Sequence, residues 1–326
     1  MRAAVVTRYG APDVVTIRDV PKPAPGAGEM LIRVHATTVN RTDAGMLHPH
    51  PPLLGRLIYG LRRPRRAIFG FDLAGVVEAV GAGVTAFRPG DRVFGLCPFR
   101  TNGAHADYVC IPQTSPIAQI PDGLDFADAV VCEGAYYADS GLRKYRVGPG
   151  HAILVYGASG AIGSAAVQLA KAYGAEVTAV VPTPHVDLAR SLGADRVIDY
   201  TREDFSRLGR RFDFVFEAVG KTSYFRSRRL LKPGGIFMAT DVGPWAHYLP
   251  LLLWSAITRS HRVVVPLPPP GGAPAFVAAL AARMAAGQFR AVVDRTYPLA
   301  EIAEAYRYVE TGRKAGIVVI AVAGSR

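Results

Sequence analysis

Short apolar runs alternate with amphipathic stretches through the second part of the chain, from about residue 121 to residue 266. The runs have the length of buried strands, whereas the stretches between them carry apolar residues at helical spacing. The predicted strands are residues 152–156, 176–181, 196–199, 212–217, 235–240 and 262–265, and the predicted helices are residues 161–173, 186–192, 223–231 and part of 250–258. Six strands joined by crossover helices predict a doubly wound α/β domain with a six-stranded parallel sheet.

The pattern before residue 120 is different, because its apolar runs are short or alternating and are separated by glycine and proline. The runs predict strands at residues 3–7, 30–36, 72–80, 92–94 and 106–111. We expect a small antiparallel, barrel-like domain. A proline- and arginine-rich insertion at residues 48–66 interrupts it, and we expect that insertion to be mobile.

The end of the chain leaves the parallel pattern again. It predicts helices at residues 275–286 and 299–309 and strands at residues 292–297 and 316–322. We expect this segment to return to the first domain. The predicted domains are therefore residues 1–120 completed by residues 267–326, and residues 121–266.

The composition is that of a globular enzyme with about two domains, since 50% of the 326 residues are hydrophobic and 20% are charged. No run comes near the roughly 18 apolar residues that a membrane span needs. Cys97, Cys110 and Cys132 are too far apart for a CxxC metal pair. We expect reduced thiols in a cytoplasmic protein.

The net charge is +12, and one segment concentrates basic residues. Basic residues are dispersed except in residues 55–66, GRLIYGLRRPRR, where no nucleic-acid-binding motif accompanies the arginines. Two interpretations stay open: a solvated loop, or a positive field that draws an anionic cofactor or substrate to a cleft. We expect a small-molecule substrate, and neither nucleic acid nor a membrane-spanning segment.

A glycine-rich turn follows the predicted strand at residues 152–156. The turn consists of Gly157, Ala158, Ser159, Gly160, Ala161, Ile162 and Gly163, and it leads directly into a helix. A turn without bulk lets phosphates approach, while the N–H groups and the dipole of the helix N-terminus attract an anion. The segment therefore predicts a dinucleotide pyrophosphate site. The alternative is a tight turn that serves only strand–helix packing.

The order of motifs along nearly the whole chain resembles the medium-chain dehydrogenase/reductase superfamily. It is most similar to the zinc-free quinone-oxidoreductase branch and its bacterial NAD(P)-dependent alcohol dehydrogenase relatives. The motifs are ATTVNRTD at 36–43, GFDLAGVVEAVGAGVTAFRPGDRVFG at 70–95, GAHADYV at 103–109, IPDGL at 120–124, the glycine turn, LGADRVIDY at 192–200, EAVG at 217–220, LLKPGGIF at 230–237 and AYRYVETGRKAGIVV at 305–319. The resemblance implies a GroES-like catalytic domain, a Rossmann domain, an active-site cleft between them and a homodimer formed through the last Rossmann strand.

Zinc ligands of the zinc-dependent relatives are replaced in this chain. Asn40 stands where those relatives have a cysteine, and Gly70-Phe71-Asp72 stands where they have Gly-His-Glu. Cys132 falls near the third ligand position but would be alone, so we expect no zinc. Without a Lewis acid, alcohol oxidation lacks its usual stabilisation of the alkoxide, which favours reduction of an electron-poor acceptor.

The adenosine end of the cofactor is predicted from the strand at residues 176–181. No acid follows it to bind a ribose 2′-OH, which favours NADPH, with NADH or dual use as the alternative. The resemblance matches Thr183 and Tyr200 to positions that hold the 2′-phosphate. Pro184 and His185 replace the usual basic residue, and His185 is either a further donor or a solvated loop residue.

Candidates near the nicotinamide come from several segments. Asn40 is an orienting donor or a turn residue, and Asp43 is either catalytic or structural. The resemblance places Val219, Gly220, Asp241 and Gly243 beside the ribose and nicotinamide, at the carboxyl edge of the sheet. It also places Lys314 near the cofactor, although that lysine could lie on the surface.

A proton must also reach the reduced product. Tyr59 in the insertion is a candidate donor, and Glu133 is either functional or a helix-capping residue. We expect an NAD(P)H-dependent oxidoreductase that transfers hydride to a quinone or an α,β-unsaturated carbonyl. The alternatives are a metal-free alcohol or carbonyl dehydrogenase and a weakly active cofactor-binding scaffold.

Overall fold

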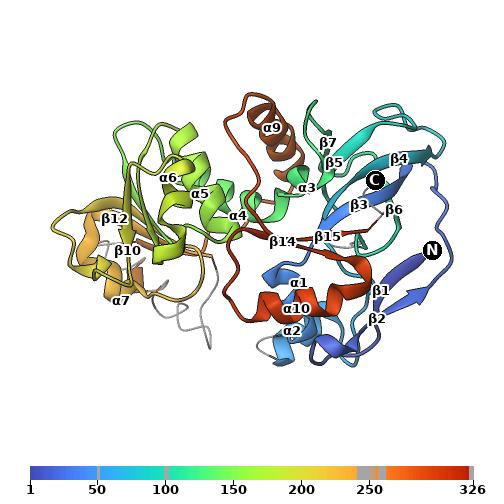
Figure 1. Ribbon diagram of the computed structural model, residues 1–326, viewed down its shortest axis with the longest axis horizontal. Coiled ribbons are helices and arrows are strands. Elements are labelled where there is room, and N and C mark those ends of the chain that lie inside the picture. Colours follow the sequence, from blue (N-terminus) through green and yellow to red (C-terminus); the bar gives the residue numbers. More distant parts are fainter. Residues whose placement is uncertain (50–51, 99–102, 241–250, 252–253, 256–261, 323–326) are drawn as a thin grey trace. The chain divides into compact units, whose positions relative to one another are not determined.

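The computed structural model describes residues 1–49, 52–98, 103–240, 251, 254–255 and 262–322. The chain forms two compact units, residues 1–133 with 271–326 and residues 134–270 (Figure 1). The first unit continues past residue 120 because helix α3 (Phe126–Ala129) packs against its strands.

The second unit is built on a six-stranded sheet whose neighbouring strands are all parallel. In spatial order the strands are β10 (Arg196–Asp199), β9 (Glu176–Val181), β8 (Ala152–Tyr156), β11 (Phe212–Glu217), β12 (Leu231–Ala239) and β13 (Arg262–Val264). The connections reverse direction at β8, so the carboxyl end of β8 is the switch point at which such sheets bind ligands. The prediction of a doubly wound parallel sheet is confirmed.

Helices cover the strands of this sheet, which is why every residue of β8 is buried. They are α4 (Cys132–Lys144), α5 (Ala161–Ala172), α6 (Val186–Ser191) and α7 (Tyr224–Ser227), with short 3-10 turns η2 (Thr183–His185), η3 (Phe205–Arg207) and η4 (Arg228–Leu230). The helix predicted at residues 223–231 is shorter than expected, because Leu231 already pairs with Phe212 and begins β12. Most of the helix predicted within residues 250–258 lies outside the described residues.

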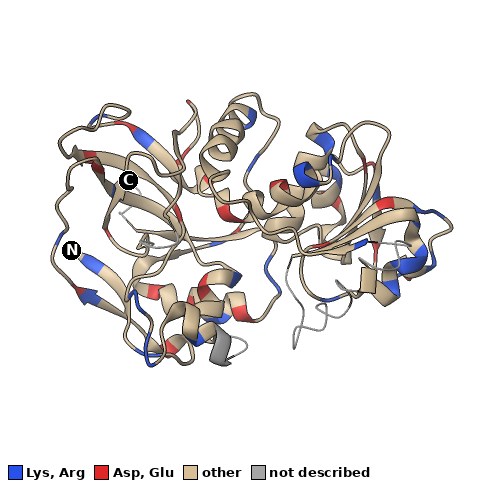
Figure 2. Cartoon of the chain, turned by 180° about the vertical axis from the view of Figure 1, so that it is seen from behind, with Lys and Arg blue, Asp and Glu red and all other residues tan. Residues whose placement is uncertain are grey.

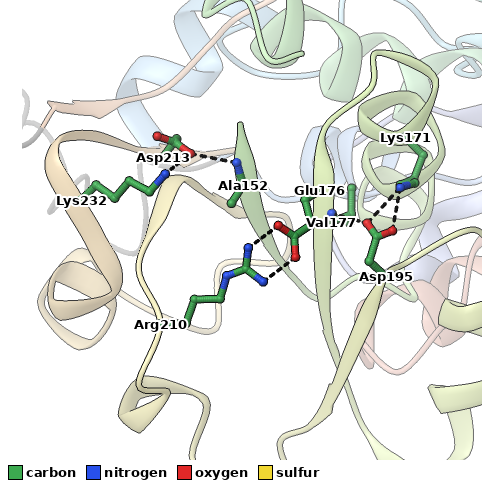
Figure 3. A network of polar contacts seen from close by, with 8 residues as sticks. All are labelled: Ala152, Lys171, Glu176, Val177, Asp195, Arg210, Asp213 and Lys232. Atoms are coloured by element: carbon green, nitrogen blue, oxygen red, sulfur yellow. Dashed lines mark hydrogen bonds and ion pairs between the residues drawn. The ribbon is translucent and has the colours of Figure 1, made fainter. Parts of the chain in front are cut away.

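The amino ends of the same strands are tied together by charged side chains (Figure 3). Asp213 accepts the N–H of Ala152 and pairs with Lys232, both at 2.8 Å. Asp195 accepts the N–H of Val177 at 2.7 Å. Asp195 also pairs with Lys171, and Glu176 pairs with Arg210. These contacts anchor the edge of the sheet opposite the glycine turn.

The first unit contains a seven-stranded sheet and a separate two-stranded one. The seven-stranded sheet runs β14 (Val293–Pro298), β15 (Ile317–Ala321), β3 (Glu29–Thr38), β4 (Asp72–Val80), β5 (Arg92–Leu96) and β7 (Ile117–Gln119), and β6 (Tyr108–Pro112) also pairs with β3. The smaller sheet pairs β1 (Arg2–Val6) with β2 (Val15–Asp19). Strand β15 pairs with β3, so the end of the chain belongs to this unit.

The helices of the first unit are α1 (Arg41–Leu47), α2 (Pro52–Tyr59), α3, α9 (Ala273–Ala285) and α10 (Ile302–Glu310), with 3-10 turns η1 (Pro12–Val14) and η6 (Leu299–Glu301). Of these helices, α9 and α10 match the predicted helices at residues 275–286 and 299–309, whereas α1 and α2 form where the sequence pattern predicts no helix. Strands β2 and β7 are also absent from the sequence prediction. The insertion at residues 48–66 contains α2, a helix that the sequence pattern does not predict. Among the described residues, no helix is both long and apolar enough to cross a membrane.

Candidate active site

The glycine turn lies at the carboxyl end of β8 and leads into α5. Gly157 has φ +76°, and a Cβ there would lie 2.6 Å from Val219 Cγ1. At Gly163 a Cβ would come within 2.1 Å of the Gly157 carbonyl oxygen. Packing alone therefore requires glycine at these two positions.

Gly160 is different, because packing within the chain does not require a glycine there. A Cβ at Gly160 would meet its nearest described neighbour, Gly157 O, at 3.6 Å, which is ordinary contact. Gly160 is also the N-cap of α5, and no side chain caps the helix there. An uncapped helix N-terminus without side-chain bulk fits a pyrophosphate, whose oxygens can reach the first N–H groups. Strand–helix packing thus requires glycine at Gly157 and Gly163 but not at Gly160.

The residues predicted for the adenosine end gather beside this turn. His185 Nδ1 lies 3.0 Å from Ser159 Oγ, which joins the tip of β9 to the turn. Tyr200 is 44% exposed and stacks on Tyr156 at 6.1 Å between ring centroids. The carboxyl ends of β8, β9 and β10 therefore present these side chains at one edge of the sheet.

Thr183 carries a contact that the sequence does not reveal. Its hydroxyl donates to Asp199 Oδ2 at 2.5 Å and lies 2.8 Å from the hydroxyl of Thr201. Hydrogen bonds from Thr183 and Thr201 lower the pKa of Asp199 below its usual value. An acid thus stands at the tip of β9 after all, supplied by the neighbouring strand. The parallel register, which pairs Asp199 with Val181, is the signal that could have located it.

The loop after β11 is fixed by a buried acid. The Glu217 carboxylate accepts the N–H groups of Val219, Gly220 and Lys221 at 3.1, 2.8 and 3.1 Å. This network holds Val219 against Gly157, so that predicted residue does lie at the turn. The predicted residues Asp241 and Gly243 lie outside the described residues.

A second polar site lies in the first unit, where α1 begins. Asn40 is the N-cap of α1 and forms a capping box with Asp43, whose Oδ2 accepts the Asn40 N–H at 2.9 Å. Asp43 Oδ1 accepts the N–H of Gly70 at 3.2 Å. Burial raises the pKa of Asp43 well above its usual range. Since both oxygens of Asp43 are held by backbone groups, the geometry favours the structural role for this residue.

Asp72, the first residue of β4, connects this cap to Glu133. Asp72 Oδ2 accepts hydrogen bonds from Thr38 Oγ1 at 2.8 Å and Asn40 Nδ2 at 3.3 Å, and Oδ1 accepts the N–H of Glu133 at 2.8 Å. Glu133 Oε1 in turn accepts the hydroxyl hydrogen bond of Thr42. Burial, as the main cause, raises the pKa of Asp72 to about 6 and that of Glu133 to about 7. We call Asp72 and Glu133 the carboxylate pair.

Lys314 faces the same group from the segment before β15. Its Nζ donates to the carbonyl oxygen of Gly316 at 2.6 Å. Burial lowers the pKa of Lys314 to about 8, although the charge of Glu133 opposes that shift. The predicted residues Asn40, Asp43, Glu133 and Lys314 are therefore neighbours in one unit. Asp72 is the member that the sequence did not select, and a buried acid at the start of a strand is its signal.

Comparison with known proteins supports the resemblance. Residues 26–122 match the model of the alcohol dehydrogenase GroES-like domain, and residues 192–320 match that of a zinc-binding dehydrogenase. The chain is 31% identical over 338 residues to a 2-methylene-furan-3-one reductase from Solanum lycopersicum, covering 98% of this chain and 79% of that protein. It is 30% identical over 332 residues, with the same two coverages, to the chloroplastic NADPH-dependent alkenal/one oxidoreductase of Arabidopsis thaliana. The structure of the quinone oxidoreductase from Coxiella burnetii aligns over 99% of both chains with a TM-score of 0.83 and 25% identity.

The chain belongs to the medium-chain dehydrogenase/reductase family. This membership confirms the predicted combination of a GroES-like domain with a Rossmann domain. It also confirms the predictions of an oxidoreductase and of a nicotinamide cofactor. The glycine turn is the part of this family member whose geometry fits that cofactor.

The side chains at the positions where zinc-dependent relatives bind the metal are poor zinc donors in this chain. The Asn40 amide nitrogen donates to Asp72, and Phe71 is buried and apolar. Cys132 is fully buried, and burial raises its thiol pKa well above the usual value. In the part of the chain that is described, no three His, Cys, Asp or Glu side chains are grouped so as to hold a metal ion. The residues at these positions do not fit a catalytic zinc.

Tyr59, the other predicted proton donor, lies on α2. It is half-buried, and its ring packs against the apolar core of the first unit. Burial raises the pKa of Tyr59 above its usual value. This position makes Tyr59 a support for α2 as well as a candidate donor.

Proposed function

We propose that the chain is an NADPH-dependent, zinc-independent reductase of quinones and α,β-unsaturated carbonyls. The observation that carries this proposal is the open N-terminus of α5 at Gly160, which packing does not explain and a pyrophosphate does. The substrate class follows from similar proteins, which are named for alkenals and enones, a methylene-furanone and quinones.

NADPH is proposed over NADH because β9 itself ends without an acid. Tyr200 is exposed beside the tip of β9, where it can contact a 2′-phosphate. Asp199 is the group that opposes this choice, since its carboxylate lies at 2.5 Å from the Thr183 hydroxyl. Binding of a 2′-phosphate then requires Thr183 to turn from Asp199 to the phosphate.

The chemistry needs a hydride and a proton. The nicotinamide, when bound, supplies the hydride to the electron-poor carbon or oxygen of the acceptor. We assign the proton to Glu133, whose pKa of about 7 leaves a large protonated fraction at neutral pH. Asp72 accepts hydrogen bonds from the Glu133 backbone N–H and from the Asn40 side-chain amide. We therefore assign Asp72 and Asn40 as positioning residues for Glu133.

Chain connectivity supports a role for Glu133 near the cofactor. Gly134, the next residue, packs in the second unit against Ala161, the first residue of α5. A Cβ at Gly134 would lie 3.2 Å from Ala161 Cβ, which explains a glycine at this point. Glu133 is thus bonded directly to a residue that packs against the first residue of α5, the helix that follows the glycine turn.

The direct test is oxidation of NADPH and of NADH with a panel of quinones, enones, and saturated aldehydes and alcohols, together with the metal content of the purified protein. We expect turnover with quinones or enones, preference for NADPH and no stoichiometric zinc. Tight NADPH binding without turnover on any acceptor would favour a scaffold protein. Turnover confined to alcohols or saturated aldehydes would favour the dehydrogenase alternative.

The glycine turn has a separate test in a matched pair of variants. Gly160→Ala adds a methyl group only where a ligand is expected, so we expect normal folding and NADPH affinity reduced about tenfold, roughly the loss of one good hydrogen bond. Gly163→Ala places its methyl group against Gly157 O and should destabilise the protein itself. Equal NADPH affinity in Gly160→Ala and the parent protein would mean that the pyrophosphate does not bind at this turn.

A further inference from the structure

Residues 55–66, which we call the arginine lobe, have no role in the proposed reaction apart from Tyr59, the second candidate proton donor. The lobe starts within α2 and contains Arg56, Arg62, Arg63, Arg65 and Arg66. No aspartate or glutamate occurs anywhere between Asp43 and Asp72 in the sequence. Basic residues occur throughout both units (Figure 2), but this stretch combines them with an uninterrupted absence of acids.

The lobe is held in one conformation by contacts with its own residues and with the first unit. The Tyr9 hydroxyl donates to Gly60 O at 2.6 Å, and the Arg65 N–H donates to Tyr59 O at 2.8 Å. Gly60 has φ +133°, and a Cβ there would come within 2.1 Å of Arg63 O, so the turn is tight. Pro64 is buried. These contacts tie the lobe to the first unit at Tyr9 and close its turn at Gly60.

The surface of the lobe carries large apolar side chains among the arginines. Leu57 and Ile58 are each 51% exposed and Leu61 is 61% exposed. All five arginines are exposed as well. Leu57 and Ile58 lie on α2, and Leu61 follows soon after its end at Tyr59, so the three exposed apolar residues are close together in the sequence. Elsewhere, exposed residues such as Ile17 and Leu267 are separate from one another in the sequence.

We propose that the arginine lobe binds the surface of an anionic lipid bilayer. Leu57, Ile58 and Leu61 would enter the boundary between headgroups and acyl chains, and the arginines around them would contact lipid phosphates. A combination of basic and exposed apolar side chains is typical of segments that bind at a membrane interface. The net charge of +12 adds long-range attraction to an anionic surface.

Other anionic partners fit this face less well. A nucleic acid would satisfy the arginines through its phosphates but would leave the three apolar side chains without contacts. A solvated loop would leave both sets of side chains without a reason to be together. The inference does not depend on the proposed reaction, because it involves neither the cofactor nor the carboxylate pair.

The test is co-sedimentation of the full chain with vesicles of phosphatidylcholine alone or mixed with phosphatidylglycerol, at low and high salt. We expect binding to the anionic vesicles that weakens with salt, and little binding to phosphatidylcholine alone. The variant L57S/I58S/L61S should bind anionic vesicles at least tenfold more weakly, and R62Q/R63Q/R66Q should do the same. The matched controls are I17S/L267S, which changes exposed apolar residues elsewhere, and R228Q/R229Q, which changes exposed arginines elsewhere.

Unfolding temperature is measured for every variant, so that a folding defect is recognised. All the changed side chains are exposed, and we expect each variant to unfold close to the parent protein. The proposal is wrong if the lobe variants bind like their controls, or if the parent protein binds neither vesicle. It is also wrong if L57S/I58S/L61S alters the oligomeric state and leaves vesicle binding unchanged, since the face would then join two copies of the chain.

Discussion

Two groups of carboxylates in this protein have opposite surroundings. In the carboxylate pair of the first unit Asp72 is buried and Glu133 is half-buried, and the pair accepts hydrogen bonds from hydroxyl, amide and backbone groups. Lys314, also half-buried, is the cation that lowers the pKa of Glu133. Asp213 and Glu176 at the amino edge of the parallel sheet are partly exposed, and each pairs with a cation, as Figure 3 shows.

The pKa values follow these surroundings. Burial raises the pKa of Asp72 to about 6 and of Glu133 to about 7. Burial would also raise the pKa of Asp213, but the Ala152 N–H and the Lys232 ammonium lower it below its usual value. The first group can therefore hold and release a proton near neutral pH, whereas the second stays charged and fixes strand ends.

The largest expected effect is on catalysis. Glu133→Gln keeps the size and the acceptor for the Thr42 hydroxyl but removes the transferable proton. We expect turnover with an enone to fall about a hundredfold, within the usual range for loss of a general acid, with NADPH affinity unchanged. Steady-state oxidation of NADPH and binding titration measure the two quantities.

The matched control is Glu176→Gln, which changes the same residue type in the exposed group. Its turnover should equal that of the parent protein. The pH profile separates proton donation from a structural defect: parent turnover should decline as pH rises through about 7, whereas the residual activity of Glu133→Gln should lose that decline. A Glu133→Gln variant with full activity, or with the pH profile of the parent protein, would show that Glu133 does not donate the proton.

The second effect of Glu133→Gln is on stability, which we expect to increase at high pH even though turnover falls. The folded protein raises the pKa of Glu133 above that of the unfolded chain, so its contribution to stability is fully present below about pH 4 and is lost as pH rises through about 7. Glu133→Gln carries no charge and should therefore be more stable than the parent protein at pH 8, by on the order of 2 kcal/mol.

Urea unfolding at several pH values measures this difference. The two proteins should have similar stability near pH 4, because the parent carboxyl is neutral there. A variant that is less stable than the parent at pH 8 would mean that Glu133 is held ionised by Lys314, contrary to the proton-donor assignment.

The sequence predicts the second unit better than the first for a physical reason. Central parallel strands are buried on both faces, so β8 is a continuous apolar run and β9 and β11 are mostly buried. The predicted bounds of these three strands and of β10 match the structure. In the first unit β2 has four exposed residues out of five, and its apolar pattern is weak. Helix α1 is defined by the capping box of Asn40 and Asp43, a local signal that the strand-centred interpretation of this segment overlooked.

The residues of the candidate active site also differ in how well the sequence predicts them. Contiguous residues such as Gly157–Gly163 were predictable, because one segment contains the whole motif. Asp199 and Asp72 were not selected as site residues, because each acts through a pairing between distant segments. Asp199 reaches the tip of β9 only through strand register, and Asp72 reaches Glu133 only through tertiary packing.

The smallest expected effect is at the amino edge of the sheet. Asp213→Asn keeps an acceptor for the Ala152 N–H but loses the ion pair with Lys232, which is partly exposed. We expect a loss of about 1 kcal/mol in the free energy of unfolding at pH 7, and unchanged turnover. Because the folded state lowers the pKa of Asp213, its stabilisation is present above about pH 4 and is lost as the pH falls below that. Urea unfolding should therefore show the difference between variant and parent shrinking in acid, the reverse of the Glu133 comparison; a difference that grows in acid would mean that burial, not the ion pair, controls Asp213.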